Sequence, residues 1–338
     1  MNAVLDIEKT SAETRQAQGR VAALKEAVQS EDYAACIERA MLWTQYSKNK
    51  ANQSSSKSEF IASATRHVLR NKTVEIYPNE LVVGNFTASR VGGIFYPEMT
   101  GIAPMMEIFK IPTRRVNPLR IKFWDRVKLA LTIPFWLNKN TAYLAFDNNK
   151  ERGRFAREQG EALQYQLYEA GGIAHLAPGY EKLIKVGAEG IIDEVDALER
   201  QTDDPAKHEF YRSVKIAMSA LSEFGDRYAT EATRLATEES DPQRKAELER
   251  IAEICTRVPR KGATCFYEAV QSMTLAHIAI FQETTGETTC PGRIDQFLNP
   301  YFEKDLAEGR ITREEAKEIL GAFCVKICET IPVWAETT

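Results

Sequence analysis

A long segment with apolar residues at helical spacing lies between two Asp-Pro pairs of this chain. Asp204 precedes Pro205, and Asp241 precedes Pro242. Aspartate can accept a hydrogen bond from an unpaired N–H of the first helical turn, and proline suits the first helical position because its missing N–H is not needed there. Each pair therefore predicts a helix start. Between the pairs, apolar side chains recur at helical spacing at Phe210, Val214, Ala217, Leu221, Phe224, Tyr228 and Leu235.

Two more segments, in the C-terminal third of the chain, are predicted to be helices. Residues 263–282 are nearly all apolar, which is typical of a helix buried on every side. Thr312 and Glu315 have the spacing of a capping box, in which each side chain bonds the backbone N–H of the other. The helix that this box opens places Ile319 and Phe323 inward and ends before Pro332. The chain is therefore expected to be helix-rich.

Residues 71–100 have a different character from the helical segments. Thr73–Tyr77 and Leu81–Val83 are short runs of β-forming residues, and Pro78-Asn79-Glu80 between them is a turn signal. Gly92-Gly93 predicts a bend or loop. The sequence contains no internal repeat and no linker that separates two domains, so residues 1–338 are expected to form one unit without a second domain.

The overall composition is that of a soluble globular protein. Hydrophobic residues make up 43% and charged residues 27% of the chain, with a formal net charge of −4. A large basic field, as nucleic-acid binders usually carry, is absent. The sequence has no apolar run of the roughly 18 residues that a membrane span needs, and the N-terminus has no apolar signal region. We therefore expect a cytoplasmic protein with neither nucleic acid nor a membrane as a partner.

Residues 107–142 form the most basic segment and interleave their lysines and arginines with Phe123, Trp124, Phe135 and Trp136. An amphipathic helix of this kind can lie on a membrane or on a partner. The favoured interpretation is a solvated face over a packed apolar stripe, which the stems of lysine and arginine cover.

Short catalytic motifs give no function for this chain. The sequence has no Walker loop, dinucleotide fingerprint, GxSxG or HExxH motif. None of its six cysteines forms a CxxC pair, and no cysteine–histidine cluster has zinc spacing. No metal and no bound cofactor are therefore expected.

A family resemblance begins at Glu80-Leu-Val-Val-Gly-Asn85, which precedes a Tyr96-Pro97-Glu98 segment. This stretch resembles the ELIVGN-type stretch of glycyl radical enzymes in the pyruvate formate-lyase-like superfamily. Three further blocks resemble the same family in the same order, at residues 172–191, 210–259 and 266–301. The four blocks together extend over roughly residues 75 to 330, so the chain is identified as an N-terminal portion of the pyruvate formate-lyase-like domain.

The resemblance implies an α/β fold, the N-terminal part of a strand barrel that helices surround. In the family, one barrel loop bears a cysteine that becomes a thiyl radical, and a loop near the C-terminus bears the glycine that stores the radical. An activating enzyme that uses S-adenosylmethionine and an iron–sulfur cluster generates that glycyl radical. A buried barrel suits this chemistry because it excludes water from a reactive intermediate.

Family chains are much longer than this one, and both radical loops lie beyond Thr338. We therefore expect a fragment of a lyase, decarboxylase or fumarate-adding synthase that acts on a small molecule, forms a homodimer at full length and is inactive alone. No cysteine of this chain is assigned as the radical residue. The alternative is a non-catalytic half-barrel that binds a partner chain of a split enzyme or the activating enzyme.

Four residues are candidates for substrate binding by resemblance. His175 follows Gly171-Gly172 in a loop that approaches the substrate in the family, and a histidine there can donate a hydrogen bond or move a proton. Thr288 and Cys290 fall where the family presents small polar side chains. Arg293 can hold a substrate carboxylate bidentately, although an ion pair with Asp295 is the favoured interpretation.

The family resemblance also bears on the substrate. Polyol-dehydrating members usually have serines where this chain has Thr288 and Cys290, which disfavours a polyol. The sequence favours a carboxylate-bearing, partly apolar substrate, such as those of arylacetate decarboxylases or fumarate-adding synthases. His277 lies in line with Phe266, Val270, Met273 and Phe281 on the apolar helix, so it is expected to be a core histidine.

Overall fold

The computed structural model describes residues 19–54, 56–99, 102–141, 143–144, 149–154, 175–284 and 288–333. Residues 19–30 are helical. The helices that follow are α2 (Glu38–Lys48), α3 (Lys57–Asn71), α4 (Ile102–Met106), α5 (Phe123–Ala130), α6 (Ile133–Trp136), α8 (Tyr180–Glu199), α9 (Pro205–Glu238), α10 (Pro242–Arg257), α11 (Phe266–Glu283), α12 (Ile294–Ala307) and α13 (Arg313–Lys326). Two short 3₁₀ helices cover Lys50–Ser54 and Ile111–Thr113. The strands are β1 (Ala34–Cys36), β2 (Gly92–Ile94), β3 (His175–Leu176), β4 (Thr288–Thr289) and β5 (Thr330–Pro332).

The helix starts lie where the sequence predicts them. The side chain of Asp204 accepts a hydrogen bond from the N–H of Ala206 at the start of α9, and Asp241 does the same at the start of α10. Thr312 and Glu315 form the complete capping box of α13. These three predictions are confirmed because a cap depends only on residues within one turn of the helix start.

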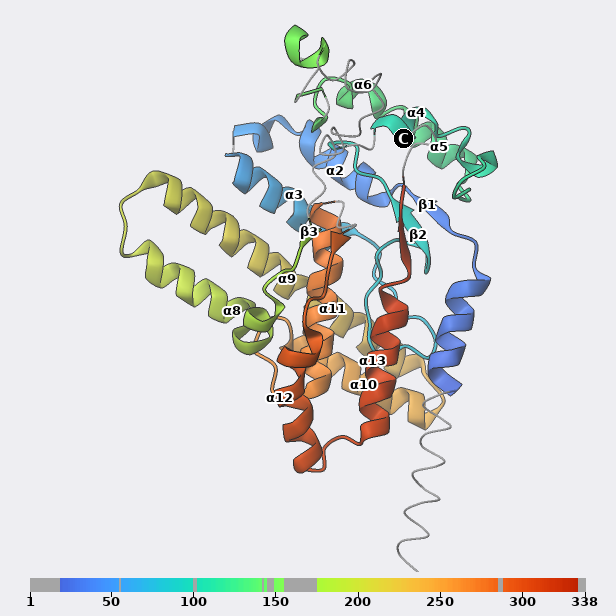
Figure 1. The fold of residues 1–338 in the computed structure, drawn as a ribbon, viewed down its shortest axis with the longest axis vertical. Helices are drawn as coiled ribbons and strands as arrows, with labels where there is room; N and C mark the ends of the chain where they lie inside the picture. Colours follow the sequence, from blue (N-terminus) through green and yellow to red (C-terminus); the bar gives the residue numbers. More distant parts are fainter. Residues whose placement is uncertain are drawn as a thin grey trace, which may run out of the picture.

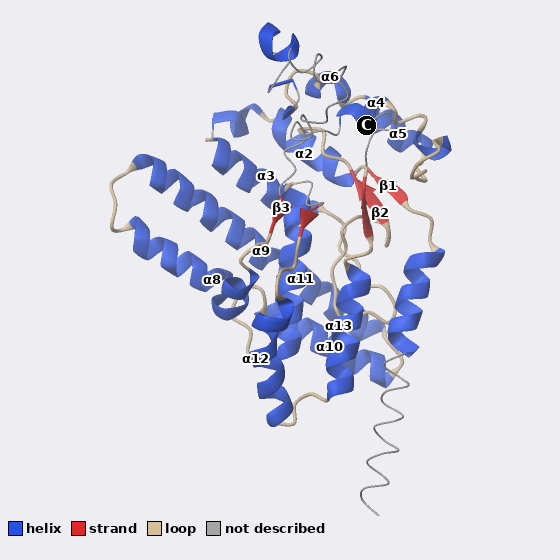
Figure 2. Ribbon diagram, in the orientation of Figure 1, coloured by secondary structure: helices blue, strands red, loops and turns tan. Residues whose placement is uncertain are grey.

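The strands form two small parallel sheets between the helices. In the first sheet β2 is the central strand, with β1 and β5 on either side. The second sheet consists of β3 and β4 alone. Parallel neighbours need long crossover connections, and the helices of this chain provide them. Figure 2 shows the strands in the middle of the molecule, with α4 to α6 at one end and α10, α12 and α13 at the other.

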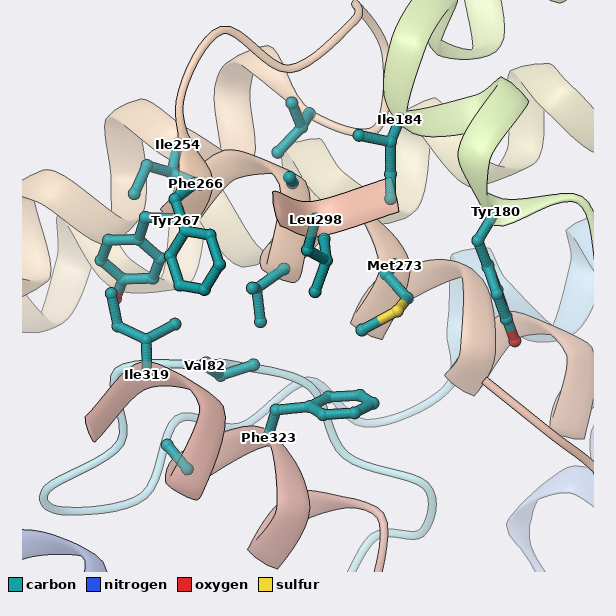
Figure 3. Packing of buried hydrophobic residues seen from close by; sticks show 14 of the residues in the cluster. Val82, Tyr180, Ile184, Ile254, Phe266, Tyr267, Met273, Leu298, Ile319 and Phe323 are labelled. Carbon is teal, nitrogen blue, oxygen red and sulfur yellow. The ribbon is translucent and has the colours of Figure 1, made fainter. Parts of the chain in front are cut away.

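Helix α11 is the central element of the core. It contacts α3, α8, α9, α10, α12 and α13, and most of its residues are buried. Helices α8 and α9 extend side by side away from it (Figure 1). Figure 3 shows Phe266, Tyr267 and Met273 of α11 among Ile184, Leu298 and Phe323 from three other helices. The predicted buried helix at 263–282 is therefore confirmed, and it positions the segments attached to its two ends.

The two β-like runs at residues 73–77 and 81–83 are not strands, so this prediction is wrong. Side chains satisfy their backbone groups instead of a neighbouring strand. Gln271 of α11 bonds both the N–H of Val83, at 2.9 Å, and its carbonyl oxygen, at 2.8 Å. The N–H of Asn85 donates to the hydroxyl of Tyr228 at 2.8 Å. The buried segment therefore meets its hydrogen-bonding needs without a sheet.

The basic segment at residues 107–142 only partly matches the expected packed stripe. Leu129 and Trp136 are buried, as the expectation requires. Phe123 and Trp124 of α5, however, are 59% and 69% exposed. Helix α5 is short, so few of its side chains face the core. Leu129 is the residue of this helix that is buried, and Phe123 and Trp124 face away from the core. Separately, the part of the chain that the structure describes contains no helix long and apolar enough to cross a membrane.

Candidate functional site

Strands β3 and β4 bring two of the sequence-predicted residues together. His175 and Thr288 lie opposite each other in the parallel register, and Leu176 lies opposite Thr289. The N–H of Cys290 donates to the carbonyl oxygen of Leu176 at 2.8 Å, which continues the pairing by one residue. Residues separated by more than a hundred positions in the sequence thus meet at one strand pair, which we call the β3–β4 site.

A buried hydrogen bond fixes the β3 side of this site. The hydroxyl of Tyr180, at the start of α8, lies 2.8 Å from Nδ1 of His277 in α11. The rings of Phe86 and Phe281 also contact the imidazole. Burial lowers the pKa of His277 to about 4 and raises the pKa of Tyr180. His277 is therefore a neutral core histidine, as the sequence predicts, and it ties the residues just after β3 to α11.

Arg39 holds the end of α11, the helix that precedes β4 in the sequence. It is 2% exposed and donates to the carbonyl oxygens of Gln282 and Glu283, at 2.9 and 3.2 Å. These carbonyls end α11, where a helix leaves acceptors without internal partners and where its dipole favours a positive charge. Arg39 also bonds the Glu98 carboxylate at 2.5 Å. The guanidinium therefore holds the end of the helix that leads toward β4.

The three-stranded sheet is anchored by a buried charge cluster. Lys326 donates to both Glu80 and Glu329, and all three side chains are 2% exposed. Burial raises the pKa of Glu329, although Lys326 lies beside it. Burial also opposes the charge on Lys326, but the two carboxylates outweigh it, and the pKa of Lys326 rises. The cluster joins the family-like Glu80 segment to the residue just before β5.

The other two predicted residues lie at the outer edge of the site. Cys290 is exposed. Arg293, at the start of α12, is exposed and forms a bidentate pair with Asp295, with distances of 3.0 and 2.9 Å. Gln296 also bonds Asp295 at 3.0 Å. Hydrogen bonds from Arg293 and Gln296 lower the pKa of Asp295. The ion pair that the sequence favours is therefore formed.

Sequence reasoning missed Thr289 and Arg39. Thr289 is buried, and its Oγ1 has no hydrogen-bond partner among the residues that the structure describes. Its neighbours Thr288 and Cys290 were singled out, so the Thr-Thr pair was the available signal. Arg39 had no signal, because the carbonyl groups that it holds at the end of α11 lie more than two hundred residues away and the Glu98 carboxylate lies 59 residues away.

The chemistry open to the site is hydrogen bonding and proton transfer. Histidine, threonine and cysteine can each donate or accept a hydrogen bond. Within the described ranges, no three His, Cys, Asp or Glu side chains come close enough to hold a metal ion. The backbones of His175 and Thr288 lie on paired strands, and rigid elements of this kind hold functional residues more precisely than loops do.

Comparisons with known proteins match this architecture to one family. The profile of the "Pyruvate formate lyase-like" family matches residues 10–338. Isethionate sulfite-lyase of Nitratidesulfovibrio vulgaris is 31% identical over 291 residues, 82% of this chain and 35% of that protein. (2S)-3-sulfopropanediol dehydratase of Klebsiella oxytoca is 30% identical over 91% of this chain and 38% of its own length. Trans-4-hydroxy-L-proline dehydratase of Clostridioides difficile is 30% identical over 86% of this chain and 37% of its own.

Solved structures agree with the sequence comparisons. A glycyl radical enzyme from Archaeoglobus fulgidus superposes with a TM-score of 0.87 at 32% identity, over 94% of this chain and 41% of that one. The glycerol-bound B12-independent glycerol dehydratase from Clostridium butyricum superposes with a TM-score of 0.86 at 30% identity, over 94% and 40%. The expected helix-rich α/β fold class is confirmed. The chain spans between a third and two fifths of the length of the curated relatives reported above.

Proposed function

The chain belongs to the pyruvate formate lyase-like family of glycyl radical enzymes, and from that premise we propose that it supplies the β3–β4 wall of the substrate site in a glycyl radical lyase or dehydratase. The observation that carries this proposal is the register pairing of His175 with Thr288. The family resemblance implicates each of the two residues in substrate binding on its own, and the strand register brings them together. Tyr180 and Arg39 act as positioning residues for the two strands.

The radical residues belong, in this proposal, to the part of the full-length protein that lies outside this chain. When present, the glycyl radical and its cysteine partner supply the hydrogen abstraction that starts the reaction. The residues of this chain bind and orient the substrate and move a proton at its polar group. Histidine suits the proton step because its unperturbed pKa is about 6.5, and threonine suits orientation because its hydroxyl both donates and accepts.

We propose a small substrate that carries a hydroxyl and an acid group. Isethionate, sulfopropanediol and hydroxyproline, which name three of the relatives, each combine a hydroxyl with a sulfonate or carboxylate. This choice keeps the acid group that the sequence favours. The sequence favours a substrate with an acid group and an apolar part, and the proposed substrate has a hydroxyl in place of the apolar part. The polar residues His175 and Thr288 are suitable hydrogen-bond partners for that hydroxyl. Decarboxylation and addition to fumarate stay as less favoured reactions of the same site.

The proposal is tested with the full-length protein, expressed without oxygen together with a radical S-adenosylmethionine activating enzyme. Electron paramagnetic resonance is expected to show a glycyl radical in the full-length protein and none in residues 1–338 alone. The activated enzyme is then assayed with isethionate, (2S)-3-sulfopropanediol, trans-4-hydroxy-L-proline and glycerol. Turnover of a hydroxy acid in preference to glycerol supports the proposed substrate class.

Two variants test the site itself. His175→Gln is expected to lower kcat/KM by about a hundredfold or more, because a positioned proton donor contributes about that much. Thr288→Val is expected to lower it by about tenfold, since one neutral hydrogen bond is lost. Phe210→Ser, at an exposed position on α9, is the control and is expected to keep wild-type activity. Equal activity of the wild type and the three variants would show that the β3–β4 site takes no part in the reaction.

The alternative is a half-barrel that binds a partner chain or the activating enzyme without catalysing a reaction. It predicts that residues 1–338 form a stable complex with a separate chain that carries the radical loops. Co-purification from the native cell, with intact mass measured for each chain, distinguishes the two proposals. A single polypeptide much heavier than 38.2 kDa supports the enzyme.

A further inference from the structure

A second site candidate lies away from the β3–β4 site, in a cavity of about 530 Å³. We call it the aromatic pocket, because Trp43, Phe60, Phe135 and Trp136 line it. Glu98, just after β2, and Thr284, just after α11, also line it. Pockets that hold small organic ligands usually measure about 300–1,000 Å³ and combine apolar walls with a few polar groups. The cavity therefore has the size and lining of a ligand site.

The walls of the aromatic pocket are held in place by contacts outside it. Trp43 of α2 and Trp136 of α6 are 3% and 4% exposed. The indole Nε1 of Trp136 donates to Oγ1 of Thr44 at 2.9 Å, and the ring of Phe135 packs edge-on against Trp136. Rings fixed in this way do not need to be ordered when a ligand binds, which lowers the entropic cost of binding.

One carboxylate oxygen of Glu98, which lines the pocket, has no partner among the residues that the structure describes. Oε1 of Glu98 accepts from Arg39 at 2.5 Å. Oε2 of the same carboxylate is buried and has no hydrogen-bond donor within the described parts of the chain. Buried polar atoms in proteins nearly always have a hydrogen-bond partner. A buried polar atom without one destabilises the fold by about 1–3 kcal/mol. A ligand with a donor group would satisfy this oxygen.

The charge around Glu98 selects the kind of donor. The guanidinium of Arg39 already supplies the positive charge that balances this carboxylate. It lies over the rings of Trp43 and Tyr96, at 4.4 and 4.3 Å from their centres. An ammonium ligand would lose its hydration and be repelled by the nearby guanidinium of Arg39. A carboxylate ligand would be repelled by the carboxylate of Glu98. A neutral O–H or N–H donor avoids both costs.

We propose that the aromatic pocket is a second small-molecule site, which binds a neutral, ring-sized apolar ligand through one hydroxyl or N–H group that donates to Oε2 of Glu98. The ring packs against Phe60, Phe135 and Trp136, and the donor points toward Glu98. Lys57 is exposed at the pocket, and the ammonium groups of Lys139 and Lys48 lie over the ring of Phe135, at 4.7 and 5.5 Å from its centre. These cations add to the cost of bringing in a cationic ligand, which again favours a neutral one. This site does not depend on the proposed radical chemistry.

The test uses the full-length protein without activation and four probes that share a benzene ring. Benzyl alcohol carries the proposed neutral donor, toluene has none, benzylamine is a cation and benzoate is an anion. Isothermal titration calorimetry or ligand-observed NMR measures each affinity. Benzyl alcohol is expected to bind at least about tenfold more tightly than each of the other three, which corresponds to about 1.4 kcal/mol.

Two variants locate the binding. Ile61→Trp fills the pocket from α3 and is expected to abolish binding of benzyl alcohol, whereas Phe210→Trp, at an exposed position of α9, is the matched control and is expected to leave it unchanged. Glu98→Gln replaces the carboxylate with a weaker acceptor and is expected to reduce the preference for benzyl alcohol over toluene by about threefold or more. Thermal melting of each variant confirms that it folds.

Each outcome decides the proposal. Tightest binding of benzyl alcohol, lost in Ile61→Trp and kept in Phe210→Trp, supports it. Equal binding of toluene would show that Glu98 selects nothing, and tighter binding of benzylamine or benzoate would overturn the neutral class. Absence of binding by all four probes to the folded wild-type protein would show that the pocket is not a ligand site. None of these results bears on the β3–β4 site, which is tested by turnover.

Discussion

The hydroxyl of Tyr180 and Nδ1 of His277 lie 2.8 Å apart in the interior, although ninety-seven positions separate them in the sequence. Both side chains are almost fully buried. Tyr180 begins α8 shortly after β3, and His277 lies in α11, whose end leads toward β4. This bond therefore connects the two strands of the β3–β4 site through the core.

His277 is expected to make stability depend on pH. In the folded protein its pKa is lowered to about 4 by burial, whereas an unfolded chain has the ordinary value near 6.5. As pH falls from 6.5 toward 4, the unfolded state binds a proton that the folded state does not, so stability is lost. The loss from this one group approaches about 3 kcal/mol at pH 4.

His277→Gln removes this titration and keeps a polar side chain. The variant is expected to be less stable than wild type at pH 7, because the fit to Tyr180 and Phe281 is lost. The difference between the two proteins is expected to shrink as the pH is lowered to 5. Thermal melting of both proteins at each pH measures it. A constant difference between pH 7 and 5 would mean that His277 does not titrate as described.

The buried charge cluster is expected to be sensitive to the loss of Lys326. Lys326→Met leaves the carboxylates of Glu80 and Glu329 buried without the ammonium group that pairs with both of them. Removal of one partner of such a cluster costs about 3–5 kcal/mol. The cost is expected to be smaller at pH 5 than at pH 8, because Glu329, whose pKa burial raises, then takes up a proton.

Lys317→Met is the control for the Lys326 prediction. Lys317 pairs with Glu314 on the same helix, but its side chain is 71% exposed. Surface pairs of this kind contribute less than about 0.5 kcal/mol. Denaturation in urea at both pH values compares the two variants. Similar midpoints for the two would show that the buried cluster contributes no more than a surface pair.

Gly187 is expected to tolerate no side chain. Its φ of +72° bends α8, and a Cβ atom there would overlap the backbone of Arg260 and Lys261. Gly309 has a similar φ of +69° but open space around it. Gly309→Ala is therefore expected to cost about 1 kcal/mol from the backbone angle alone, and Gly187→Ala about 3 kcal/mol or more because backbone must also move. Melting temperatures that fall equally would contradict the packing argument.

Arg293 is expected to stabilise local structure without binding the substrate. Its guanidinium is occupied by Asp295 in a bidentate pair. In the activated full-length enzyme, Arg293→Ala is therefore expected to change KM by less than about twofold, since surface pairs contribute little. Steady-state kinetics on the preferred substrate measure the change. A rise in KM of tenfold or more would instead assign Arg293 to the acid group of the substrate.

Local signals in the sequence determined the helices and their starts. Asp204, Asp241 and Thr312 each cap a helix through an N–H within three residues. The apolar run around His277 was enough to predict a buried helix. These features follow from the sequence because the interacting groups are near neighbours along the chain, so their geometry is set by the helix itself.

The tertiary structure decided which distant groups meet. The runs at 73–77 and 81–83 have the composition of strands, but side chains take their backbone hydrogen bonds. Gln271 bonds the backbone of Val83, and the side chains of Glu38, Asn85 and Glu80 accept from N–H groups of the first run. Intrinsic strand preference is weaker than such contacts, because it reflects packing against neighbours. The family resemblance pointed to His175 and Thr288 separately, and only the register of β3 and β4 placed them opposite each other.

Sequence alone thus determined the helix-rich class, the capped helix starts and the family of this protein. The tertiary structure decided which carbonyl groups Arg39 holds at the end of α11 and that His175 pairs with Thr288. It also left one oxygen of Glu98 without a donor from the described residues. The physical reason is the distance along the chain. Contacts between residues far apart in the sequence form only when the whole core packs. A local sequence pattern does not predict which distant groups then come into contact.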